Sequence, residues 1–96
     1  MFELKYSDEA NEQYFSLKDN PSKLSVFKQV KKALGYLEVN PRHKSLQTHK
    51  HHQKSIQYGF EVFEAYAQND TPGAYRIFFR YSGKDKIIVL TITQHP

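Results

Sequence analysis

The last quarter of the chain constrains the fold most, because residues 75–95 alternate as the two strands of a β-hairpin do. A two-residue loop at Gly83-Lys84 would join these strands. Successive side chains along a strand point to opposite faces of the sheet, so the pairing assigns each residue to a face. One face is then apolar and combines residues of both strands: Ile77, Phe79, Ile88 and Leu90.

The other face of this hairpin carries polar and basic chemistry. Its first strand contributes Arg76, Phe78 and Arg80, and the loop position sets them opposite Thr91, Val89 and Ile87. His95 continues this face at the end of the second strand. A sheet face that only met water would more often carry Lys and Glu. Arginines, a threonine and a histidine on one face therefore predict a phosphate-binding surface.

Composition limits the class of protein. The chain has 96 residues, of which 39% are hydrophobic, which suits one domain with one core. It has no cysteine, which excludes a disulfide framework and a cysteine-based zinc site. No apolar run approaches the ~20 residues of a membrane span, and residues 1–7 lack the features of a signal peptide. We expect a cytoplasmic protein with no membrane partner.

Positive charge is concentrated in the middle of the chain. The net charge is +4, and the stretch from Lys23 to Lys54 holds eight Lys or Arg residues, four histidines and one acid. This distribution favours a polyanionic partner. Lys50 and Lys54 are the expected RNA contacts of a basic loop at residues 42–59. The alternative is a mobile loop with no role. Its histidines lack a nearby carboxylate in the sequence, so we expect no metal.

The remaining elements can be predicted from caps and periodicity. Residues 2–6 alternate as a strand, Ser7 is a helix N-cap, and Asn20-Pro21 ends the first helix and begins the second. The second helix carries an apolar stripe and ends at residues 40–41. A short extended piece is expected within the basic loop, and a strand within residues 60–67. The stripe consists of Leu24, Phe27, Val30, Leu34 and Leu37.

The predicted fold is α+β, in the order β-α-α-β-β-β. A two-helix hairpin would pack on one face of a small antiparallel-rich sheet and leave the other face open. Parity places Arg76 and Arg80 on that open face. Parity alone does not say which face Glu64 and Tyr66 share.

This element order resembles that of the RelE/ParE superfamily of small bacterial toxins. The residues that carry the resemblance lie in three segments, 40–46 (NPRHKSL), 63–66 (FEAY) and the closing pair that runs from Tyr75-Arg76 to His95. Arg76 matches a catalytic arginine of the family, and His95 matches a histidine of its YoeB-type ribonucleases. The sequence departs from RelE at Glu64 and Tyr66, where RelE has lysines, and from YoeB-like proteins at Pro96, where they have tyrosine.

The resemblance implies an activity and two kinds of partner. Many RelE-like members cleave mRNA in the ribosomal A site, so the resemblance implies the ribosome and mRNA as partners. It also implies a small cognate antitoxin, which is acidic where it binds the toxin. ParE members instead inhibit gyrase, so a non-nuclease binding module of the same fold is the alternative. The sequence also leaves a strand-edge homodimer open.

Metal-independent RNA cleavage needs a base, a cation and an acid, and no cofactor. Glu64, Arg76 and His95 could fill these roles in that order. Each also has a plain structural interpretation: a solvent-side carboxylate, a surface arginine that pairs with Glu64, and a frayed terminal residue. Tyr66 could stack on a base, orient the phosphate or only pack in the sheet, and Arg80 is expected to bind the RNA backbone.

Overall fold

A five-stranded mixed sheet forms the framework of the protein in the computed structural model, which describes residues 1–95 and leaves Pro96 outside the described residues. The strand order is β1-β5-β4-β3-β2. β1 runs parallel to β5, and the other neighbours are antiparallel. The α+β, antiparallel-rich prediction is therefore confirmed. The strands are β1 (Glu3–Tyr6), β2 (His49–Lys50), β3 (Phe63–Tyr66), β4 (Tyr75–Ser82) and β5 (Lys86–Gln94).

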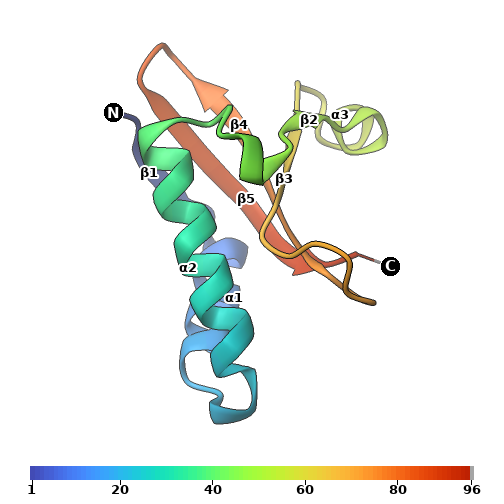
Figure 1. The fold of residues 1–96 in the computed structure, drawn as a ribbon. Coiled ribbons are helices and arrows are strands. Elements are labelled where there is room, and N and C mark those ends of the chain that lie inside the picture. Colours follow the sequence, from blue (N-terminus) through green and yellow to red (C-terminus); the bar gives the residue numbers. More distant parts are fainter. Residues whose placement is uncertain (96) are drawn as a thin grey trace.

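Two helices cover one side of this sheet, as Figure 1 shows for α1 (Asp8–Lys18) and α2 (Leu24–Val39). Ser7 is the N-cap of α1, as predicted, because its side chain accepts a hydrogen bond from the Ala10 N–H. Pro21 does not begin α2. It begins a 3₁₀ turn, Pro21–Lys23, from which α2 continues.

The main core lies between these two helices and the sheet. Val30, Leu34 and Leu37 of the predicted stripe are buried, whereas Leu24 is 52% exposed. Leu24 is the first residue of α2, next to the 3₁₀ turn, and this end of the helix is solvent-exposed. The sheet side of this core is formed by Ile77, Phe79, Ile87, Val89 and Ile92.

The predicted hairpin register is wrong, although the face assignment within β4 is right. Ser82 pairs with Lys86, so the connection is one residue longer than expected, and a β-bulge lies beside Phe78 and Phe79. Ile77 and Phe79 therefore pair with Ile92 and Val89 in the core. The arginine face pairs differently from the prediction: Arg76 with Thr93, Phe78 with Thr91 and Arg80 with Ile88.

The opposite face is not fully open, because a third helix partly covers it. The loop that was expected at residues 42–59 contains a 3₁₀ turn (Lys44–Leu46), β2 and the helix α3 (His52–Tyr58). β2 confirms the predicted extended piece. Phe78 packs there with Val62 and Leu90, and Tyr58 of α3 joins them. Burial, and then the negative charge of Glu9, raise the pKa of the Tyr58 phenol.

Ser7 connects α1 to the middle of β5, so its loss should be measurable. Its Oγ accepts from Ala10 N at 3.0 Å and donates to Leu90 O at 2.7 Å. We expect Ser7→Ala to lower the free energy of unfolding by about 1–2 kcal/mol, measured by urea denaturation. Ser16→Ala, at an exposed position of the same helix, is the control and should cost nothing. A Ser7→Ala protein as stable as wild type would contradict this role.

Candidate functional site

The candidate site lies on the sheet face opposite α1 and α2. The β3–β4 register sets Glu64 opposite Phe78 and Tyr66 opposite Arg76. Alternate residues of each strand share a face, so these side chains lie together. The structure thus answers the question that sequence parity left open, because Glu64 and Tyr66 share the face of Arg76. Glu64 and Arg76 are only 6% and 9% exposed.

Both carboxylate oxygens of Glu64 face a basic group. Oε2 lies 3.5 Å from Arg76 Nε, and Oε1 lies 2.8 Å from His49 Nε2. Arg76 Nη1 donates to Gln68 O at 2.6 Å, whereas its buried Nε has no hydrogen-bond partner among residues 1–95. Charge attraction therefore holds Arg76 to Glu64. The pairing considered from the sequence is present, but it is buried.

Tyr66 supports this pair from the side. The guanidinium carbon of Arg76 lies 3.7 Å from the centre of the Tyr66 ring, a cation–π contact. The His49 ring meets the same tyrosine edge-on, at 5.9 Å between centroids. Tyr66 thus packs against the basic groups, which is the structural role that the sequence left open.

His49 is a member of the site that sequence reasoning missed. Its Nδ1 lies 2.8 Å from Gln47 O and its Nε2 faces Glu64. Both oxygens are acceptors, so the two hydrogen bonds together require a proton on each ring nitrogen or a proton on Glu64. The segment around His49 has no periodicity, so only the pairing of β2 with β3 shows that His49 sits opposite Glu64.

A groove beside Glu64 brings the predicted acid and base together. It has a volume of about 450 Å³ and separates α3 from the ends of β4 and β5. His95 is exposed at its rim, where its backbone N–H donates to Ala74 O at 2.7 Å. Lys54 places Nζ 4.9 Å from the Phe78 ring centre. The residues that line the groove are His51, Gln53, Lys54, Gln57, Glu64, Phe78, Thr93, Gln94 and His95.

Three predicted RNA contacts are absent from the lining of this groove: Tyr66, Lys50 and Arg80. Lys50 neighbours His49 in β2 and therefore points to the other face of the sheet, where its Nζ lies 3.5 Å from Glu61. Arg80 shares the face of Arg76, but its guanidinium stacks on Phe60 at 4.1 Å, outside the groove lining. Sequence alternation placed Arg80 on the right face but could not foresee its aromatic partner.

Three of the four loop histidines, His43, His49 and His51, have hydrogen-bond partners. His51 caps α3, because its Nδ1 accepts from Lys54 N at 3.1 Å, and His49 is bound to Glu64. Within residues 1–95 no three His, Asp or Glu side chains come close enough to hold a metal ion. No helix of this described part is long and apolar enough to cross a membrane.

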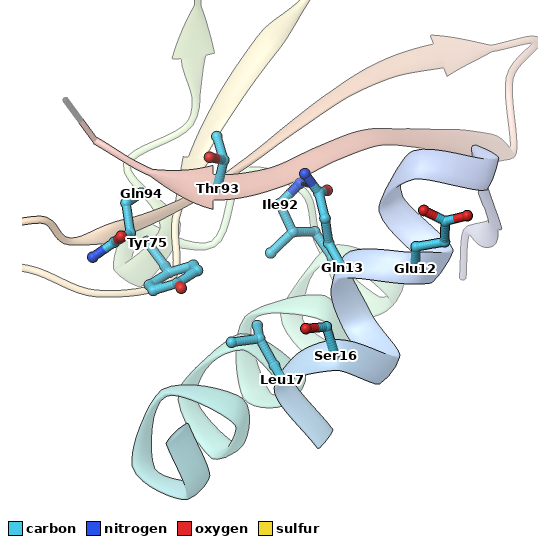
Figure 2. Close-up of a pocket in the computed structure, with 8 residues that line it drawn as sticks. All are labelled: Glu12, Gln13, Ser16, Leu17, Tyr75, Ile92, Thr93 and Gln94. Carbon is cyan, nitrogen blue, oxygen red and sulfur yellow. Dashed lines mark hydrogen bonds between the residues drawn. The ribbon is translucent and has the colours of Figure 1, made fainter. Parts of the chain in front are cut away.

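A second hollow, of about 380 Å³, lies between α1 and the end of β5. Figure 2 shows Gln13 reaching from α1 toward Ile92, whose N–H donates to Gln13 Oε1 at 2.6 Å. The lining includes Glu12 but no Lys, Arg or His. This hollow therefore lacks the cations that a phosphate needs, in contrast to the groove beside Glu64.

The fold is shared with a known toxin–antitoxin protein. No family model and no curated protein matches the sequence. The structure is similar to a chain in the crystal structure of the heterotetrameric YoeB-YefM toxin–antitoxin complex from Staphylococcus aureus, with a TM-score of 0.69. The match covers 100% of this chain and 99% of that one at 13% sequence identity. The expected RelE/YoeB-like fold is thereby confirmed.

Proposed function

We propose that this protein is the toxin of a toxin–antitoxin pair, and that it cleaves mRNA on the ribosome without a metal ion. The observation that carries the proposal is the groove that Glu64 and His95 share, with Arg76 held against Glu64. These are the residue types that metal-independent RNA cleavage needs. The fold shared with a chain of the YoeB-YefM toxin–antitoxin complex supports the toxin–antitoxin role.

In this mechanism Glu64 removes the proton of the 2′-OH, whose oxygen attacks the adjacent phosphorus. The charge of Arg76 stabilises the phosphorane, and His95 protonates the 5′-oxygen as it leaves. Arg76 is nearly buried and does not line the groove, so its charge would act from beside Glu64, which does. With Glu64 ionised, the two hydrogen bonds of His49 place a proton on each of its ring nitrogens, so the proton taken from the 2′-OH stays on the Glu64 carboxyl group.

The other predicted contacts surround this chemistry. Lys54 lines the groove and would contact an RNA phosphate there. Arg80 and Tyr66 lie on the same face and extend the RNA surface, whereas Lys50 would contact RNA only from the opposite face. The partners of this cytoplasmic toxin are the ribosome with its mRNA and an acidic antitoxin that covers the basic face.

Primer extension on an abundant mRNA after induced expression tests the proposal. Cuts within codons that appear on induction, and are absent from an uninduced culture, are the expected result. Ribosomes assembled on a defined mRNA, with EDTA-treated purified protein, should show the same cuts without metal carried by the protein. Growth arrest with intact mRNA would reject the nuclease.

One observation favours the alternative, a binding module of the same fold. Glu64 is only 6% exposed and already contacts two basic side chains, so its carboxylate serves the protein's own ion pairs rather than standing free in the groove. A gyrase inhibitor of this fold would arrest growth with intact mRNA and slow DNA supercoiling by purified gyrase. A supercoiling assay on the same protein preparation therefore separates the two functions.

A further inference from the structure

The glutamine side chains fall into two groups in this structure. Most of them hydrogen-bond elsewhere in the protein: Gln13, Gln29, Gln47, Gln68 and Gln94. Gln53 and Gln57 make no side-chain hydrogen bond to any part of the chain that the structure describes. Both are exposed, and both line the groove beside Glu64.

Gln53 and Gln57 lie on the same side of α3, the side that lines the groove. They lie four residues apart in α3, so they occupy one side of that helix, one turn apart. The opposite wall of the groove carries Thr93 and His95. Two unused amides therefore face the place where the proposed mechanism puts the scissile phosphate.

We propose that Gln53 and Gln57 read the base of a single-stranded RNA nucleotide bound in this groove, with adenine as the preferred base. The inference rests on the proposed function, because its ligand is that function's substrate. A glutamine amide both accepts from N6–H and donates to N7 of adenine, which makes the pair bidentate. Unstacked bases of single-stranded RNA expose these edges to side chains.

The surroundings of the groove fit a nucleotide. Its volume of about 450 Å³ falls in the ~300–1,000 Å³ range of small-ligand sites. Lys54 and His95 supply positive or protonatable groups beside the amides. The one carboxylate in the lining, Glu64, is already bound to His49 and Arg76, which limits its repulsion of a phosphate.

A merely solvated helix side would be a simpler explanation for these glutamines. The exposed side of α2 carries Lys28, Lys31 and Lys32, and its one exposed glutamine, Gln29, donates a hydrogen bond to Ser25 Oγ. α3 instead turns neutral donor–acceptor groups toward a groove. Glutamine amides at these positions would favour adenine, whereas lysines would favour guanine.

NMR titration of ¹⁵N-labelled protein with 2′-O-methyl dinucleotides tests the inference, since these ligands cannot be cleaved through a 2′-OH. The side-chain NH₂ signals of Gln53 and Gln57 should shift with ApA, and ApA should bind at least about fivefold more tightly than CpC or UpU. Gln53→Ala/Gln57→Ala should keep binding but bind all dinucleotides alike. Gln29→Ala, on α2, is the matched control and should behave as wild type.

Several outcomes would overturn the base-reading role: no dinucleotide binding, no shift of the two amides, or the same preference in the double variant. These results are independent of the nuclease assay. If the protein cut mRNA within codons but dinucleotides did not shift the NH₂ signals of Gln53 and Gln57, the nuclease proposal would stand and the base-reading proposal would be rejected. If the protein cut no mRNA but preferred adenine, and the double variant lost this preference, the base-reading proposal would stand and the nuclease proposal would be rejected.

Discussion

Arg76→Ala is expected to abolish mRNA cleavage and to lower the free energy of unfolding by about 3–5 kcal/mol, because it leaves the buried Glu64 carboxylate without its arginine. Arg76 and Glu64 are 9% and 6% exposed, and their ion pair spans 3.5 Å. The substitution also removes the hydrogen bond to Gln68 O and the stacking on Tyr66. Urea denaturation measures the stability, and ribosome-dependent cleavage of a defined mRNA measures the activity.

Two further variants separate folding from chemistry. Arg76→Ala/Glu64→Gln removes the uncompensated charge and should recover most of the lost stability while it stays inactive. Arg76→Lys keeps a cation for Glu64 and should fold, but should cleave at least about tenfold more slowly, because an ammonium cannot replace a planar guanidinium stacked on Tyr66. Full activity of Arg76→Lys would show that only the charge matters. An Arg76→Ala protein as stable as wild type would show that the ion pair adds nothing.

Alternation along β4 could be read from the sequence because it depends on only one strand. Ile77 and Phe79 are buried in the main core, and Arg76 and Arg80 lie on the other face, as parity predicts. The pairing with β5 could not be read in the same way. The longer connection and the bulge near Leu90 depend on how Leu90 packs with Phe78 and Val62 across the sheet.

The sequence could name candidates for the site one by one, from strand alternation and the family resemblance, as for Arg76, Glu64 and His95. It could not show which residues from other elements lie beside them. His49 lies opposite Glu64 because two residues of β2 pair with β3, and no local periodicity marks such a short strand. α3 was missed because its seven residues are held by contacts with Phe78 rather than by a strong helical pattern. The groove that α3 completes was therefore invisible in the sequence.

His95→Ala should reduce the rate of mRNA cleavage by about 10²–10⁴-fold, the usual contribution of one general acid. The side chain is exposed at the rim of the groove, and the hydrogen bond to Ala74 O comes from the backbone, which the substitution keeps. Because His95 is exposed, we expect its substitution to lower the free energy of unfolding by about 1 kcal/mol or less. Single-turnover cleavage on programmed ribosomes measures the rate, and urea denaturation measures the stability.

The comparison of His95→Ala with Gln94→Ala decides whether His95 acts through its imidazole. Gln94 precedes it in the same groove lining and donates to Gly73 O at 3.1 Å, so its loss perturbs the same end of β5 without removing a titratable group. Gln94→Ala should retain most of the activity. If His95→Ala cleaved as fast as Gln94→Ala, the leaving oxygen would take its proton from another titratable residue of the groove lining, namely His51, Lys54 or Glu64.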